Sequence, residues 1–190
     1  MHTAFTIETY MRTDPFLIVP RPGDEFSEPH WYAAYTSANH EKRVAEQAGR
    51  RSLECFLPLY ESVRRWKDRR VRLQLPLFPG YVFVRLASRD RLKVLEIPGV
   101  AKLVGFDGRP TPVPDEDIEL IRKCLGGHHA IEPYRYVQRG QRVRVLSGPL
   151  AGLTGIVLRQ KKRTLFVITL ELLMRSVAVE LDDSMLSFER

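Results

Sequence analysis

The amino-acid sequence predicts an α+β fold in which an antiparallel sheet flanked by helices is followed by a linker and a small C-terminal β-barrel. Across residues 30–125, strand and helix patterns are interleaved with hairpins, which favours an antiparallel sheet backed by helices. A Gly-Gly pair and Pro133 interrupt the pattern at 126–136, as is typical of a linker. Over residues 137–190, glycines separate short alternating stretches, which suits the sharply bent strands of a small barrel.

The composition is that of a globular protein. The chain has 190 residues, 44% of them hydrophobic and 28% charged, enough for one or two domains with their own cores. No apolar stretch approaches the roughly 20 residues that span a bilayer. The N-terminus lacks a secretory signal, so we expect a cytoplasmic protein. Cys55 and Cys124 form no CxxC pair, which excludes a disulfide framework and a thiolate zinc site.

Charge is distributed unevenly along the chain. The formal net charge of +7 favours a polyanionic partner. Residues 1–29 are acidic, contain several prolines and show no periodicity, so they predict a flexible leader outside the fold. The densest positive segment is 64–72, where six of nine residues are basic.

Periodicity predicts the elements of the N-terminal domain. Residues 31–36 (WYAAYT) predict a buried strand, and 40–51 predict a helix because their few apolar residues recur at helical spacing. A second strand is predicted at 55–63, with a kink or an edge position at Pro58.

Two further strands are predicted at 73–77 and 81–86, separated by Phe78-Pro79-Gly80. The basic segment 64–72 therefore lies at or near the turn of a β-hairpin. Its charges project from the sheet, where they can follow a phosphate backbone.

The domain closes with a predicted helix at 88–97, a strand at 100–106 and a helix at 115–125. The last helix has an acidic first turn and a basic end, which complement the helix dipole. In the C-terminal domain, residues 163–170 and 176–181 predict a final hairpin, although LELLM at 170–174 has a conflicting helix propensity.

Two sets of motifs carry a resemblance to a known family. The first comprises Trp31-Tyr32, Leu77-Phe78-Pro79-Gly80-Tyr81-Val82-Phe83-Val84, Pro98-Gly99-Val100 and Val104-Gly105. The second comprises Gly140, Val143 to Val145, Gly148-Pro149-Leu150, Gly152 and Gly155-Ile156-Val157. The first set resembles the N-terminal (NGN) domain of NusG-type transcription elongation factors, and the second resembles the KOW motif of an SH3-like barrel. The compact segment before Phe78 is more similar to specialised antitermination paralogues of the RfaH and capsule-operon kind.

The resemblance implies a monomeric factor that binds the clamp helices of the large catalytic subunit of RNA polymerase and promotes processive elongation and antitermination. It places polymerase binding on Phe78, Tyr81, Phe83 and Leu103. For Phe83, core packing is an equal alternative. The KOW domain would recruit a small-subunit ribosomal protein or the termination factor Rho.

The same geometry directs two groups of basic residues towards non-template or upstream DNA, with a solvated charged face as the alternative for each. Trp66 can stack on an unpaired base or pack against the hairpin. The predicted nucleic-acid-binding residues are Arg64, Arg65, Trp66, Lys67, Arg69, Arg70 and Arg72 of the hairpin, with Lys42, Arg43, Arg50 and Arg51 of the first helix.

Two rival functions remain open. An enzyme could use the carboxylates of Asp115, Glu116, Asp117 and Glu119 for Mg²⁺, but acidic residues in a first helical turn are better explained by the dipole. His128-His129 lacks neighbours of ligand spacing. We therefore expect no catalysis, no metal and no cofactor. A KOW-containing ribosomal or RNA-binding protein is the second rival, and it would leave the aromatic residues without a role.

Overall fold

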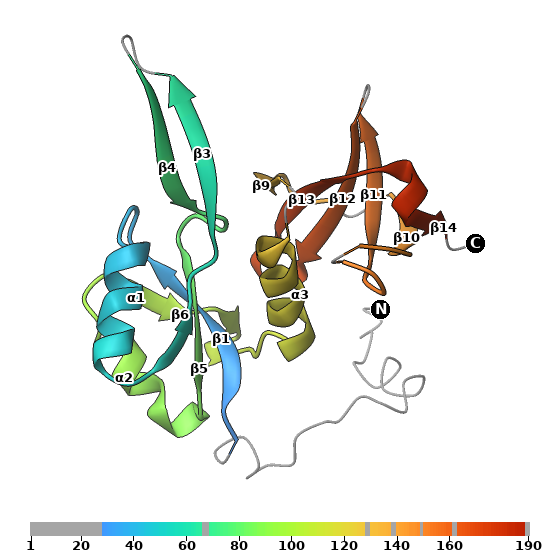
Figure 1. Ribbon diagram of the computed structural model, residues 1–190. Coiled ribbons are helices and arrows are strands. Elements are labelled where there is room, and N and C mark those ends of the chain that lie inside the picture. The colour runs from blue at the N-terminus through green and yellow to red at the C-terminus, as the bar shows by residue number, and fades with distance from the viewer. Residues whose placement is uncertain are drawn as a thin grey trace, which may run out of the picture.

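The computed structural model describes residues 28–65, 69–127, 130–137, 140–148, 150–160 and 163–188. Almost all of the predicted leader lies outside these ranges. The described chain forms two principal antiparallel sheets, one from each half of the sequence (Figure 1). None of the helices described is both long and apolar enough to cross a membrane.

The N-terminal sheet has the order β2-β5-β1-β6. Its strands are β1 (His30–Thr36), β2 (Glu54–Phe56), β5 (Tyr81–Leu86) and β6 (Val100–Leu103). Its helices are α1 (Glu41–Arg50), α2 (Arg91–Leu95), which follows a 3-10 turn at Ser88–Asp90, and α3 (Asp115–Gly126). An antiparallel sheet flanked by helices is therefore confirmed.

The two faces of this sheet pack against different helices because side chains alternate along each strand. On one face, Tyr32 and Ala34 of β1 belong to a buried cluster that also contains Val44 of α1 and Val94 of α2. On the other face, Trp31 and Ala33 belong to the cluster that contains the α3 residues Ile118, Ile121 and Cys124. Helix α3 thus covers the face opposite to α1 and α2.

The predicted strand at 55–63 is wrong as a single element, because it divides at Leu57-Pro58. Before the division, β2 pairs with β5 in the main sheet. After it, β3 (Leu59–Arg65) pairs only with β4 (Arg70–Pro76) in a separate hairpin. Pro58 has no N–H with which to continue the ladder. Its carbonyl instead accepts a hydrogen bond from the Leu77 N–H (2.8 Å), which closes the base of the hairpin.

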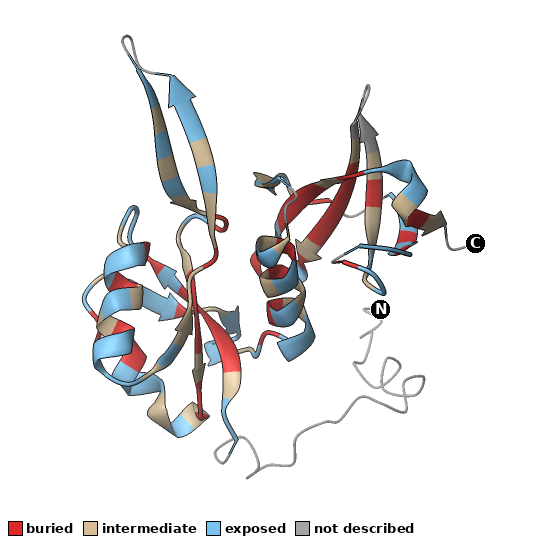
Figure 2. Ribbon diagram, in the orientation of Figure 1, coloured by how far each residue is buried: buried red, intermediate tan, exposed pale blue. Residues whose placement is uncertain are grey.

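The hairpin β3–β4 projects from the body of the protein (Figure 1). Its residues are exposed or half-buried along almost its whole length (Figure 2). The strand predicted at 100–106 also divides: β7 (Gly105–Phe106) leaves β6 and pairs with β8 (Arg109–Pro110).

The C-terminal sheet has the order β14-β10-β11-β12-β13-β9 and curls around a core that includes Val143, Phe166 and Val177. Its strands are β9 (Ile131–Tyr134), β10 (Gln141–Val145), β11 (Thr154–Gln160), β12 (Arg163–Leu170), β13 (Arg175–Leu181) and β14 (Leu186–Phe188). The predicted final hairpin is present as β12–β13.

Two local expectations in this half are corrected. Residues 171–173 form a 3-10 turn that ends at Met174 in a left-handed conformation (φ 49°), so the local helix propensity is used in the connection between two strands. The predicted linker contains β9, which pairs with β13. Residues 131–134 therefore belong to the C-terminal sheet, and Pro133 is tolerated because β9 is an edge strand.

One hydrophobic cluster continues through both halves of the chain. It contains Trp31 and Phe83 of the N-terminal sheet, Ile121 of α3, and Phe166 and Val177 of the C-terminal sheet. Helix α3 lies between the two sheets (Figure 1). The buried residues consequently concentrate on the sheets and α3, away from the hairpin (Figure 2).

Candidate interaction surfaces

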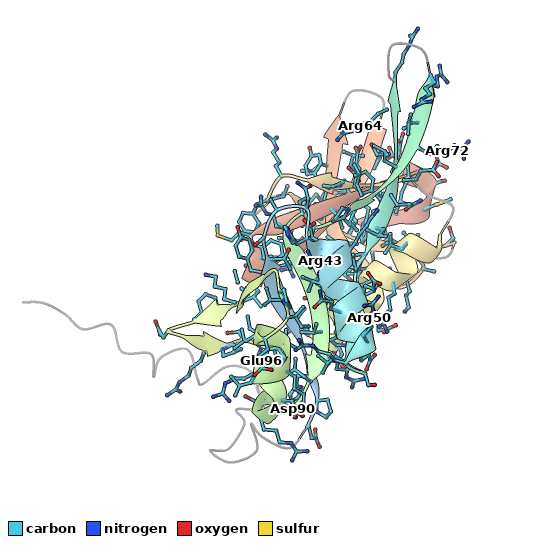
Figure 3. All side chains as sticks on the ribbon, turned by 90° about the vertical axis from the view of Figure 1, so that its left-hand side faces the viewer. Arg43, Arg50, Arg64, Arg72, Asp90 and Glu96 are labelled. Atoms are coloured by element: carbon cyan, nitrogen blue, oxygen red, sulfur yellow. The ribbon has the colours of Figure 1, made fainter. Side chains whose placement is uncertain are left out.

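The hairpin β3–β4 presents a charged face and a mainly apolar face. Its register places Arg65 opposite Arg70 and Val63 opposite Arg72, with Glu61 further along the same face. The other face carries Tyr60, Leu73 and Leu75, which are half-buried, together with Arg64 opposite Val71. Figure 3 shows Arg64 and Arg72 on opposite sides of the hairpin.

The charged face holds like charges directly opposite each other. Arg65 and Arg70 are both exposed, and within the described ranges neither forms an ion pair. Arg72 lies 3.6 Å from the Glu61 carboxylate. Opposed like charges destabilise a strand pair, so this face is suited to a bound polyanion. Arg69 is also exposed, whereas Trp66 and Lys67 lie outside the described residues.

The basic residues of α1 differ in whether they form an ion pair. Lys42 and Arg43 are exposed and form no ion pair in the described part of the chain. Arg50 pairs with Glu46 at 2.7 Å. Figure 3 shows Arg43 and Arg50 on α1, between the hairpin at one end of the molecule and Asp90 and Glu96 towards the other.

Arg51 is a correction to the predicted nucleic-acid group. Its guanidinium donates hydrogen bonds to the backbone carbonyls of Lys93 (2.8 Å) and Glu96 (3.3 Å). Carbonyls at the end of a helix have no partner within the helix. Arg51 thus satisfies the end of α2 and ties it to α1, which is a structural role.

The aromatic turn between β4 and β5 is mostly buried. Phe78 is 1% exposed, and its ring contacts Phe83 edge to face with centroids 5.7 Å apart. Phe83 is fully buried and also contacts Phe56. The expectation that Phe78 lies at the surface is wrong in this conformation, because its cluster includes α3 residues as well. Phe83 occupies the core, as its alternative interpretation held.

Leu103 is likewise buried, and it faces the other side of the sheet. Its register with Ala34 places it in the cluster beneath α1 and α2. It therefore cannot share a surface with the aromatic turn. The neighbouring Lys102 is opposite Tyr35 and lies on the α3 side.

The exposed part of this region is a pair of tyrosines, Tyr35 and Tyr81, which we call the tyrosine edge. Tyr35 is 42% exposed, Tyr81 is half-buried, and their ring centroids lie 5.5 Å apart. Sequence reasoning found Tyr81 but treated Tyr35 as part of a buried strand. The period of two along β1 could have revealed it, because Tyr35 continues the row of Trp31 and Ala33 past the end of the core.

Helix α3 forms an ion pair with the sheet through Asp115 of its acidic first turn and another within the helix itself. Asp115 lies 3.5 Å from Arg85 of β5, and Glu119 lies 2.7 Å from Arg122. The Arg122 guanidinium also stacks over Trp31 at 5.2 Å and Phe56 at 5.1 Å. These contacts hold α3 over the aromatic core. No group of metal-ligating side chains converges within the described ranges.

Asp117 is the one carboxyl of this turn with a strongly shifted pKa. Burial, reinforced by the neighbouring charge of Glu116, raises the pKa of Asp117 to about 6. Burial also raises the pKa of the Cys124 thiol to about 12, so it is an unreactive core residue. His128 and His129 lie outside the described residues.

The predicted KOW glycines have packing roles. A Cβ on Gly155 would lie 2.5 Å from the Phe166 ring, and one on Gly140 would lie 2.2 Å from the Ile156 side chain. Gly148 and Gly152 occupy the left-handed region at φ 83° and 86°. Pro149 lies outside the described residues. These positions shape the C-terminal sheet and present no chemical group of their own.

Comparisons with known proteins agree on one family. Residues 29–122 match the family model described as transcription termination factor nusG. The transcription termination/antitermination protein NusG of Campylobacter jejuni is 30% identical over 138 residues, which cover 67% of this chain and 78% of the relative. The corresponding protein of Thermus thermophilus is 29% identical over 175 residues, which cover 81% of this chain and 95% of the relative.

A solved structure supports the same fold. The structure titled "Domain interaction in Thermotoga maritima NusG" matches with a TM-score of 0.55 and 22% sequence identity. The match covers 84% of this chain and 96% of that one. It therefore extends over both halves of the fold described above.

Proposed function

Because this chain belongs to the NusG family, we propose that it is a transcription elongation and antitermination factor that binds RNA polymerase. The relatives that support this are named as termination/antitermination proteins. The present fold supplies an exposed aromatic pair and a separate basic hairpin, which suit a protein partner and a nucleic-acid partner respectively. The protein acts by binding, without catalysis, in the cytoplasm.

The tyrosine edge is the observation that carries the polymerase contact. Tyr35 and Tyr81 present large, rigid, amphipathic rings, which are enriched at the centres of protein interfaces. Tyr81 packs against the cluster that contains Phe78 and Phe83. We assign the clamp helices of the large catalytic subunit to this edge, since the aromatic residues of a Pro-Gly turn can anchor in a groove between helices.

The basic hairpin then holds nucleic acid within that complex. Arg65, Arg70 and Arg72 share one face, Arg64 lies on the other face, and Arg69 precedes β4. Lys42 and Arg43 of α1 are exposed and offer further positive charge. Non-template or upstream DNA is the polyanion that a factor on the polymerase would meet.

The C-terminal sheet recruits a further partner, for which a small-subunit ribosomal protein and Rho are the candidates. The compact segment before Phe78 favours a specialised paralogue that acts on few operons. The alternative is a KOW-containing ribosomal or RNA-binding protein. That function would place RNA affinity in the C-terminal sheet and leave Tyr35 and Tyr81 idle.

A binding titration with purified RNA polymerase tests the proposal. We expect the Tyr35→Ala, Tyr81→Ala double variant to lose about 100-fold in affinity, the order of effect of two interface anchors. Leu146→Ala provides a matched control, because Leu146 is an exposed apolar residue of the C-terminal half. Equal polymerase affinity of the wild type and the tyrosine variant, with the fold intact, would refute the assignment.

A further inference from the structure

The aromatic turn depends on a buried carboxylate from another element. Glu41, the first residue of α1, is 6% exposed. Its Oε1 accepts a hydrogen bond of 2.8 Å from the backbone N–H of Gly80, between Phe78 and Tyr81. Burial of a carboxylate is costly, so its presence here calls for a physical explanation.

The Gly80 peptide lies in a conformation that local structure alone does not secure. Gly80 has φ 86°, in the left-handed region that favours glycine. The side chain of Tyr35 packs against it, since a Cβ on Gly80 would lie 3.3 Å from the Tyr35 ring. The Gly80 carbonyl accepts a hydrogen bond of 2.8 Å from the Thr36 N–H. Both backbone polar groups of Gly80 are thus held by residues from the end of β1 and the start of α1.

The environment of Glu41 compensates part of the cost of burying its charge. The N-terminus of a helix favours a negative side chain. A hydrogen bond from a backbone N–H to a carboxylate is stronger than one between neutral groups. His40, the N-cap residue of α1, makes no side-chain capping bond. Glu41 therefore uses its carboxylate across space, on the turn, rather than within its own helix terminus.

We propose that Glu41 is a positioning residue for the tyrosine edge, which it orients by fixing the Gly80 peptide. This inference rests on the proposed function, because it assigns Glu41 a role in polymerase binding. Tyr81 directly follows Gly80, and Tyr35 packs on Gly80, so rotation of that peptide displaces both rings. Glu41 also immediately precedes Lys42 and Arg43. The first turn of α1 thereby carries both the residue that supports the tyrosine edge and two of the exposed basic residues, Lys42 and Arg43.

A matched pair of variants separates positioning from general stability. Glu41→Ala removes a tie at the start of α1. Arg51→Ala removes the tie just past the other end of α1, where the guanidinium donates to the Lys93 carbonyl. We expect Glu41→Ala to lower the affinity for purified RNA polymerase by about 10-fold, the effect of losing one charge-assisted hydrogen bond. Arg51→Ala should retain the affinity of the wild type, although it also destabilises the fold.

Two further readouts address the mechanism. Glu41→Gln keeps an oxygen acceptor, so its affinity should stay within about threefold of the wild type. In the Tyr35→Ala, Tyr81→Ala background, Glu41→Ala should cause no further loss, because the groups it orients are absent. Equal losses for Glu41→Ala and Arg51→Ala, or a full additional loss in the tyrosine background, would overturn the inference.

Amide hydrogen exchange of the full ¹⁵N-labelled chain tests the positioning independently of polymerase. In Glu41→Ala, the Gly80 amide should exchange faster, whereas the Ser37 amide, which donates to the Gly99 carbonyl, should keep its protection. Unchanged protection at Gly80 would refute the positioning role. If the wild type failed to bind polymerase while Gly80 responded as expected, the proposed function would fail and the structural role of Glu41 would stand.

Discussion

The basic hairpin and the aromatic turn are adjacent in sequence but are stabilised in different ways. The hairpin is held by its own strand register and, at its base, by the bond between Leu77 and Pro58 and by the packing of Tyr60 against the core. The aromatic turn is bound to residues of β1 and α1 and packs in a cluster with α3. The hairpin can therefore change its charges without loss of the fold, whereas the turn cannot change its rings. Side-chain chemistry controls binding at the hairpin, and three-dimensional support controls it at the turn.

The largest expected difference between the aromatic turn and the hairpin is in the free energy of unfolding after a side chain is truncated to alanine. Phe83→Ala should lower the free energy of unfolding by about 3–5 kcal/mol, because it leaves a cavity among Phe78, Phe56 and the α3 residues. Val63→Ala removes an exposed side chain of the hairpin and should change it by less than about 0.5 kcal/mol. Urea unfolding of both variants measures the contrast. Similar values for the two would mean that the hairpin is part of the core.

The comparison reverses when nucleic-acid binding is measured. The Arg65→Glu, Arg70→Glu variant should lower DNA crosslinking in an elongation complex and reduce the slope of log affinity against log salt by about two. Its stability should stay close to that of the wild type, since two opposed arginines are replaced by two opposed glutamates and the like-charge repulsion remains. Arg89→Glu with Arg91→Glu makes the same change in net charge near Asp90, towards the end away from the hairpin (Figure 3). An equal slope change in this control would indicate a nonspecific effect of net charge.

Sequence reasoning succeeded at the hairpin because its determinants are local. The basic segment, the flanking alternation and the Phe78-Pro79-Gly80 turn lie within a few residues of each other, and they predicted the projecting hairpin confirmed here. Reasoning from sequence placed a kink or an edge position at Pro58 but kept a single strand, because which sheet a strand joins depends on distant partners. It also placed Leu103 on the wrong face, since its direction is set by a register with Ala34 about 70 residues away.

The aromatic turn shows the same limit in its burial. Phe78 is covered within a cluster built with α3, which lies nearly forty residues further along the chain. No local pattern around Phe78 contains that information. Tyr35 was accessible to sequence reasoning through the period of two along β1. The contact of Arg51 was not accessible, because its carbonyl partners Lys93 and Glu96 lie at the end of α2, 42 and 45 residues further along the chain.

A change of pH should alter the stability of the region where α3 packs on the sheet more than that of the hairpin. The folded-state pKa of Asp117 is about 6, above its ordinary value of 3.8, so the folded protein binds this proton more tightly than the unfolded chain. The stabilisation is therefore fully present below about pH 4 and is lost as the pH rises through 6. Asp117→Asn should stabilise the protein at pH 7 by about 1 kcal/mol, after allowance for solvent screening. Unfolding titrations at pH 5 and pH 7 measure this, and an unchanged pH dependence in the variant would contradict it.

The smallest effect is expected at Thr36. It tests whether Thr36 supports the aromatic turn through its backbone N–H and not through its side chain. The Thr36 side chain is buried, and its hydroxyl has no hydrogen-bond partner among the described residues. Its backbone N–H, by contrast, donates to the Gly80 carbonyl. Thr36→Val keeps that N–H and replaces an unpaired hydroxyl with a methyl group of similar size. We expect the free energy of unfolding to rise by about 0.5–1 kcal/mol.

Polymerase affinity should be unchanged in the same variant, because Gly80 keeps both of its partners. Urea unfolding and the polymerase titration together distinguish this from the effect of Glu41→Ala, which removes a hydrogen-bond partner of Gly80. A loss of stability in Thr36→Val would show that the hydroxyl is bonded. A loss of affinity without a loss of stability would show that the Thr36 side chain, and not only its backbone, orients the tyrosine edge.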